Sequence, residues 1–172
     1  MAEPEPPPNK EPEPQPFEPP PPPEPTLKDF PTATLNARID QPQTLQERVD
    51  AMEEIAVRGQ GDPKTYELLT REALADTSHL TGQAKDDANY VRQAALWTLG
   101  MLNKSQNAGL PTKQLIGLNE IEQIVRNKRE NPDVKAAAIQ ALQVIDRPTD
   151  RKVKKILKRA AKDKNTDVKR LA

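Results

Sequence analysis

The sequence predicts an all-α protein, and three observations carry this prediction. Apolar residues recur one helical turn apart from residue 44 to residue 172. The periodic segments are separated by helix-boundary signals, in which Thr, Asp or Asn stands before a first turn and Pro or Gly marks a boundary. No segment in this range alternates as a half-buried strand does, and aromatic residues make up only 3% of the chain.

Charge is distributed unevenly along the 172 residues, although 26 bases and 26 acids leave a formal net charge of zero. Residues 1–30 contain seven acids and two lysines, whereas residues 151–172 contain ten bases and two acids. An acidic head and a basic tail point to interactions with partners rather than to a particular fold.

The N-terminal segment is dominated by proline, with 13 of the 19 prolines in the first 25 residues. Proline donates no backbone hydrogen bond and disfavours helix, and Phe17 is the only large apolar residue in this stretch. We therefore expect residues 1–43 to form a disordered, acidic, proline-rich arm and linker. Two interpretations stay open, a solvated spacer and a docking peptide for a proline-binding domain that would recognise Pro19–Pro23.

The first two predicted helices follow this arm. Thr44 opens a capping box, apolar residues continue at helical spacing through residue 56, and Gly59 supplies the stop. Asp62 and Pro63 then begin a second helix, with an apolar face that includes Leu69.

Four further helices are predicted after a polar loop at 76–86. Asp87 caps the first of them, and residues 103–111 form a connector. Thr112 starts the next helix, and Asn131 caps the one after it. Pro148 starts a basic helix over 148–161, and a last helix opens at residue 165.

One phrase occurs three times, as ANYVRQAALWTL at 88–99, NPDVKAAAIQAL at 131–142 and NTDVKRLA at 165–172. In each case a valine precedes a base, and the valines lie 43 and 34 residues apart. Helices that recur at this period are typical of an α-solenoid. We expect Ala95 and Ala138 to lie at close helix crossings, and the bases to point toward the polar edge of the next turn.

The stretches Asp87–Leu96 and Asn131–Ile139 resemble the second helix of HEAT repeats, of the short type also found in phycobilin-lyase-like proteins. The resemblance covers about 62–172, and 44–58 can be read as a preceding half-repeat. It implies a short HEAT-like α-solenoid of antiparallel helix pairs over 44–172, with the last repeat truncated. Proteins of this architecture serve as adaptors, scaffolds, assembly factors and lyase subunits.

Catalytic chemistry is not predicted. The chain has no cysteine and a single histidine, His79, which excludes disulfides, thiolate catalysis and a histidine metal cluster. Asp86 and Asp87 are interpreted as a helix-capping pair. We therefore expect no enzyme activity, no cofactor and no metal. No apolar run reaches the length of a membrane span and no signal peptide is visible, so a cytoplasmic location is expected.

Partner binding is the predicted activity, and two groups of residues are candidates for it. Trp97 is interpreted as a core or groove-lining residue, or as a binding anchor. The basic helix forms the second group. Its predicted partner-binding residues are Lys152, Val153, Lys154, Lys155, Ile156, Leu157, Lys158 and Arg159.

The basic helix leaves several interpretations open. It can be a solvated face, or it can bind an acidic protein, nucleic acid, an anionic membrane surface or the acidic head of its own chain. We expect its apolar stripe to be partly open at the C-terminal edge, where a protein partner would cover it in a hetero-complex.

The predicted function is a protein–protein interaction module. The alternatives are a nucleic-acid-binding module acting through 150–164 and a lyase-type subunit acting on a chromophore-bearing protein.

Overall fold

The computed structural model describes residues 26–111, 114–145 and 150–172, and within these ranges the protein is all-α. This confirms the predicted fold class. The described elements are a short 3₁₀ helix η1 (Leu27–Asp29) and the helices α1 (Thr32–Asp40), α2 (Leu45–Arg58), α3 (Pro63–Ala73), α4 (Gly82–Ser105), α5 (Leu118–Arg126), α6 (Pro132–Val144), α7 (Arg151–Ala160) and α8 (Thr166–Leu171).

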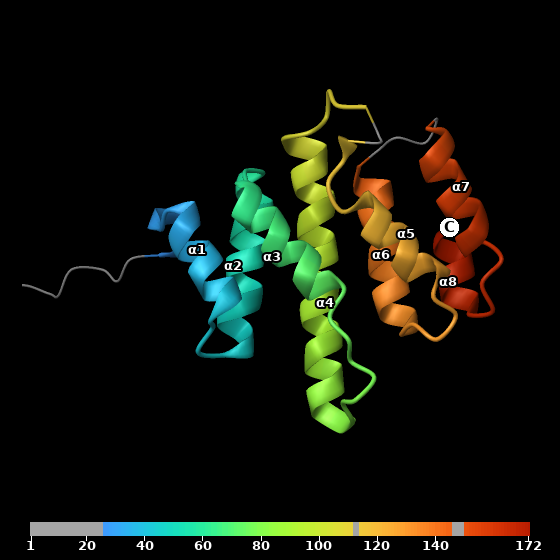
Figure 1. Cartoon of the computed structure of the whole chain (residues 1–172), viewed down its shortest axis with the longest axis horizontal. Helices are drawn as coiled ribbons and strands as arrows, with labels where there is room; N and C mark the ends of the chain where they lie inside the picture. The colour runs from blue at the N-terminus through green and yellow to red at the C-terminus, as the bar shows by residue number, and fades with distance from the viewer. Residues whose placement is uncertain (1–25, 112–113, 146–149) are drawn as a thin grey trace, which may run out of the picture.

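The even-numbered helices pack in sequence along the molecule. Helix α2 contacts α4, α4 contacts α6, and α6 contacts α8. The odd-numbered helices flank this row, since α1 packs on α2, α3 on α4 and α5 on α6, while α7 contacts both α5 and α6. Figure 1 shows α1 at one end of the row and α7 with α8 at the other.

The predicted linker at 26–43 is wrong in part, because this stretch contains η1 and α1. Leu35 and Ile39 lie one turn apart on α1 and are fully buried in the core. Arg58 of α2 also holds this segment in place, because its guanidinium donates to the backbone oxygens of Leu27 and Phe30 at 2.6 and 2.7 Å. The folded part therefore includes residues before Thr44, while the disorder predicted for residues 1–25 lies outside the described residues.

The predicted caps of α2 and α3 are present. The backbone N–H of Glu47 donates to Thr44 Oγ1 at 3.0 Å, and that of Thr65 donates to Asp62 Oδ1 at 2.8 Å. Gly59 ends α2 with a φ of 62°, in the left-handed region that favours glycine. The Glu47 carboxylate, however, accepts from the N–H of Gln43 rather than closing the predicted box on Thr44.

Helix α4 begins earlier than predicted. It runs from Gly82 over 24 residues, so Asp86 and Asp87 lie inside the first turns and do not cap the helix. The intervening residues Gln83, Ala84 and Lys85 are all good helix formers, which explains why the polar composition of this stretch does not interrupt the helix.

The starts of α5 and α7 also differ from the prediction. Helix α5 begins at Leu118, directly after Gly117, which has a φ of 78°. Asp150 caps α7 by accepting from the N–H groups of Lys152 and Val153 at 2.7 and 3.1 Å. The predicted starting residues, Thr112 and Pro148, lie outside the described residues.

The core contains both alanines for which the repeated phrase predicts close helix crossings. Ala95 of α4 and Ala138 of α6 are both fully buried. Helices α4 and α6 also meet at Gly100, where an added Cβ would lie 3.0 Å from the Cα of Ala141. Small side chains are therefore needed on both sides of this crossing.

The bases of the repeated phrase link neighbouring helix pairs. Arg92 of α4 pairs with Glu130, which precedes α6, and Lys135 of α6 pairs with Asp163, which precedes α8. Both basic side chains are only 5% exposed, so they are buried connections rather than surface charges. Lys169, in the third phrase, is exposed and makes no ion pair with another described residue.

Candidate interaction surfaces

An aromatic stripe lies on the outward face of α4. Tyr90 and Trp97 are seven residues apart, which places them on the same side of the helix, and they are 44% and 42% exposed. Ala94 and Met101 continue this line and are half-buried. We call Tyr90, Ala94, Trp97 and Met101 the aromatic stripe.

The opposite side of α4 packs against other helices. Helices α2, α3 and α6 all pack against α4, and Val91, Ala95, Leu99 and Leu102 are buried there. The interpretation of Trp97 as a core residue is therefore wrong. Trp97 is also absent from the lining of the polar groove described below, and Tyr90, its neighbour on the stripe, was not predicted as a site residue.

Helix α7 carries a basic stripe on the face opposite its buried side. Its members are exposed: Arg151, Lys155 and Lys158 lie on the helix at intervals of four and three residues, and Lys162 follows four residues later, in the turn just after α7. None of the four makes an ion pair with another residue in the described part of the chain. Lys154 is also exposed, on the flank of this stripe.

Two of the predicted basic site residues have partners within the protein. Lys152 is half-buried, and its Nζ donates to Asn119 Oδ1 at 2.6 Å. The Arg159 guanidinium lies 3.5 Å from the Glu122 carboxylate. Both contacts attach α7 to α5, so these side chains help to hold the helix in place.

The prediction of an open apolar edge on α7 is wrong. Val153 and Ile156 are each 1% exposed, and Leu157 is half-buried against the core. Helix α7 buries this side against α5 and α6, while α8 buries Val168 on α6. A partner therefore cannot reach Val153 or Ile156 without unfolding this end of the protein.

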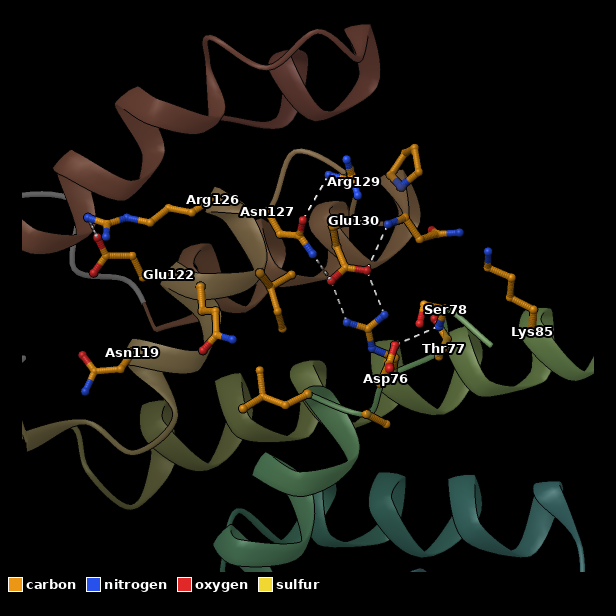
Figure 2. A pocket seen from close by; sticks show the side chains of 17 residues that line it. Asp76, Thr77, Ser78, Lys85, Asn119, Glu122, Arg126, Asn127, Arg129 and Glu130 are labelled. Carbon is orange, nitrogen blue, oxygen red and sulfur yellow. Dashed lines mark hydrogen bonds and ion pairs between the residues drawn. The ribbon is translucent and has the colours of Figure 1, made fainter. Parts of the chain in front are cut away.

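A polar groove of about 1160 Å³ separates the turn between α3 and α4 from α5 and the start of α6. Figure 2 shows Asp76, Thr77 and Ser78 on one side and Asn119, Glu122 and Asn127 on the other. The backbone N–H of Ser78 donates to Asp76 Oδ1 at 2.9 Å, and this bond lowers the pKa of Asp76 below its ordinary value. Asp76 is therefore anionic at neutral pH.

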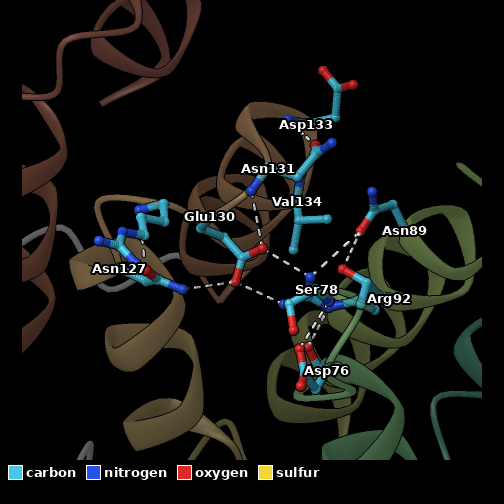
Figure 3. Close-up of polar contacts among 12 residues, drawn as sticks. Asp76, Ser78, Asn89, Arg92, Asn127, Glu130, Asn131, Asp133 and Val134 are labelled. Carbon is cyan, nitrogen blue, oxygen red and sulfur yellow. Dashed lines mark hydrogen bonds and ion pairs between the residues drawn. The ribbon is translucent and has the colours of Figure 1, made fainter. Parts of the chain in front are cut away.

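A buried ion pair forms the floor of the groove (Figure 3). Arg92 Nη1 and Nη2 each donate to a different oxygen of Glu130 at 2.8 Å, and Arg92 Nε donates to the Ala73 oxygen at 3.1 Å. Burial raises the pKa of Glu130, but the hydrogen bonds and charge of Arg92 outweigh it, so the pKa is lowered. The pair joins α3 and α4 to the turn before α6.

The central cation and anion of the polar groove, Arg92 and Glu130, pair with each other, and His79 is exposed on the neighbouring turn. No group of three or more His, Cys, Asp or Glu side chains in the described ranges is arranged to hold a metal ion. Within those ranges, no helix combines the length and the apolar character needed to cross a membrane.

The aromatic stripe and the basic stripe are separate surfaces. Helices α5 and α6 lie between α4 and α7 in the row (Figure 1). The sequence-predicted site residues are therefore not brought together into one site. The i, i+7 spacing of Tyr90 and Trp97 was the available signal for the aromatic stripe, whereas nothing local signals the pairing of Arg92 with Glu130 across 38 residues.

The chain was compared with known protein families, sequences and structures. No protein-family model, curated protein sequence or solved structure matches the chain.

Proposed function

We propose that this protein is a non-catalytic protein–protein interaction module, built as a short α-solenoid, which binds its partner through the aromatic stripe of α4. The resemblance of the repeated phrase to HEAT repeats and the regular succession of contacts along α2, α4, α6 and α8 support the solenoid interpretation. We also propose that the N-terminal arm is disordered, because 13 of its first 25 residues are prolines.

The exposure of Tyr90 and Trp97 on one helix face carries the binding proposal. Tryptophan and tyrosine are the side chains most enriched at the energetic centres of protein interfaces. This chain has only five aromatic residues, and two of them, Tyr90 and Trp97, are exposed on the same face of α4. Exposure of the Tyr90 and Trp97 rings to water does not stabilise the fold. Contact with a partner would explain why both rings lie on the surface.

The stripe has the dimensions of a contact for one secondary-structure element. From Tyr90 to Met101 it covers 11 residue steps, which corresponds to about 16 Å along a helix. The aromatic rings supply apolar area with little loss of side-chain entropy, because each has only two rotatable bonds. A partner with an apolar ridge of similar length would cover both rings at once.

The test is a binding titration with matched variants of the full chain. A partner captured from the source cells is purified and titrated against the wild type, against Y90A/W97A, and against L45A/I116A. The control variant removes two apolar side chains that are 37% exposed and lie outside the stripe. Trp97 is the only tryptophan, so in the wild type and the control its emission reports burial directly. Anisotropy of a dye-labelled partner measures the affinity of all three proteins.

Truncation of an interface anchor costs about 2 kcal/mol or more, which corresponds to a loss of about 30-fold in affinity. We expect Y90A/W97A to lose at least this much and L45A/I116A to bind as the wild type does. Equal binding by Y90A/W97A would contradict the proposal. Capture of nucleic acid in place of protein would favour the nucleic-acid alternative, and transfer of a chromophore to the captured protein would favour the lyase alternative.

A further inference from the structure

We propose that the basic stripe of α7 binds the acidic segment 1–25 of the same chain. This interaction uses a different surface from the aromatic stripe, so it does not depend on the proposed function. Its basis is the charge and spacing of the cations on α7, together with the composition and reach of the N-terminal segment.

The cations of the stripe are concentrated on one line of the helix surface. Arg151, Lys155, Lys158 and Lys162 are all exposed, and the side of α7 opposite them carries the buried Val153. Arg151, Lys155 and Lys158 are separated by about 6.0 and 4.5 Å along the helix axis at 1.5 Å per residue, and Lys162 lies just beyond the end of the helix. Four like charges at this spacing repel one another unless an anion lies between them.

The segment 1–25 has the complementary chemistry. It contains six glutamates and one lysine, and two of its motifs read Glu-Pro-Glu, at 3–5 and at 11–13. Two residues of proline-rich extended chain span about 6.2 Å at 3.1 Å per residue. The carboxylates of one such motif can therefore match two cations one helical turn apart, such as Arg151 and Lys155. Because proline has no N–H group, recognition of this segment must use the side-chain carboxylates rather than strand pairing.

The segment is long enough to reach α7. The row from α1 to α7 corresponds to three steps between neighbouring helix pairs, which is on the order of 30 Å at 8–10 Å per step. Glu13 precedes Thr26 by 13 residues and can lie up to about 40 Å from it. Glu24 is only two residues from Thr26, and Glu18 at its full extension of about 25 Å reaches no farther than the near end of this range. The four glutamates of the two motifs are therefore the ones that can extend past the full distance.

Covalent linkage makes the contact possible even though each charge pair on a surface is weak. A covalent connection that is long enough to span the two sites raises the effective concentration of the acidic segment above that of a free acidic peptide in dilute solution. The contact is screened by salt, because both partners are exposed to solvent.

The experiment uses the full chain, which contains no cysteine, so that Q15C gives a single site for a nitroxide label. Paramagnetic broadening of backbone amide signals is measured in dilute protein at low ionic strength. We expect strong broadening of the signals of α7 around Lys155 and Lys158, and its loss at high salt. The same label is then introduced into E3Q/E5Q/E11Q/E13Q, which should lose the broadening on α7.

The matched control is E18Q/E24Q, which removes the two carboxylates that have the shortest reach from Thr26. We expect this variant to keep the broadening on α7. Broadening confined to α1 and α2, or broadening on α7 that survives in E3Q/E5Q/E11Q/E13Q, would overturn the proposal. A mixture of labelled protein and isotope-labelled, nitroxide-free protein completes the test, because broadening that passes between molecules would show docking between copies and would also overturn it.

Discussion

Replacement of Glu130 by alanine should destabilise the protein more than any surface charge substitution. Glu130 and its partner Arg92 are 9% and 5% exposed, and the guanidinium donates to both carboxylate oxygens. In Glu130→Ala, Arg92 keeps its bond to the Ala73 oxygen but loses the carboxylate that accepts two hydrogen bonds from its guanidinium. The variant therefore leaves a buried cation unpaired.

The expected loss follows from this burial. Removal of one partner of a buried ion pair costs about 3–5 kcal/mol, because the remaining charge stays in a poorly solvated position. A surface pair is worth much less, about 0.2–1 kcal/mol. Lys64 and Glu67 form such a surface pair on α3, with side chains 51% and 65% exposed, and Glu67→Ala is the matched control.

Urea unfolding followed by circular dichroism measures both variants. With a slope of about 2 kcal/mol per molar urea, a loss of 4 kcal/mol moves the midpoint by about 2 M. The double variant Arg92→Met/Glu130→Leu removes both charges and fills the space with apolar side chains, so it should be much closer to the wild type. A midpoint for Glu130→Ala that matches that of Glu67→Ala would refute the reasoning, because it would mean that Arg92 is solvated and that the pair does not close the groove floor.

Two further predictions concern the packing and the charge links between helices. Ala138→Leu should lower the free energy of unfolding by about 1–3 kcal/mol, because Ala138 of α6 is fully buried in the core. An unchanged thermal midpoint would contradict this expectation. The hydrogen bond from Lys135 lowers the pKa of Asp163, so this pair stabilises fully above the ordinary aspartate value near 4 and its contribution is lost as the pH falls toward the lowered pKa. Asp163→Asn should therefore be less stable than the wild type at neutral pH and equal to it at strongly acidic pH, as measured by urea midpoints across this range; a constant difference at all pH values would contradict the assignment.

Local signals in the sequence were sufficient for most of the helices. Thr44, Asp62 and Asn131 each cap the helix that they were predicted to cap, since a short polar side chain before a periodic apolar segment acts within three residues. The three valines of the repeated phrase, together with Ala95 and Ala138, are buried for a similar reason, because helical periodicity fixes which face of the helix meets its neighbours.

Helix α1 shows where this reasoning fails. Leu35, Asn36 and Ile39 form its buried face, and two large apolar residues in nine are too few for a clear periodic pattern. The helix is held instead by tertiary contacts, among them the hydrogen bond from Asn36 Nδ2 to Asp62 Oδ1 at 3.0 Å and the ion pair between Asp40 and Arg71 at 2.8 Å. Contacts across more than 20 residues decide this element, and a local reading of the sequence does not contain them.

Local and long-range causes also decide which basic side chains of the protein are exposed and which are buried. Arg92 and Lys135 were expected to point toward a polar edge, and the basic residues of α7 were interpreted as a solvated face or a partner-binding surface; the structure separates the two groups. Lys155 and Lys158 lie directly opposite the apolar side of α7, so helical periodicity alone places them in solvent. Arg92 and Lys135 lie on the border of the buried face, where burial depends on whether another segment supplies a carboxylate, and Glu130 and Asp163 do so from 38 and 28 residues away. Each buried pair removes one positive and one negative charge from the surface together, so the basic character of α7 is not offset by them. The exposed charge of this helix must therefore be balanced by solvent ions or by an acidic segment, which is the reason that its occupant can be sought among the glutamates of the same chain.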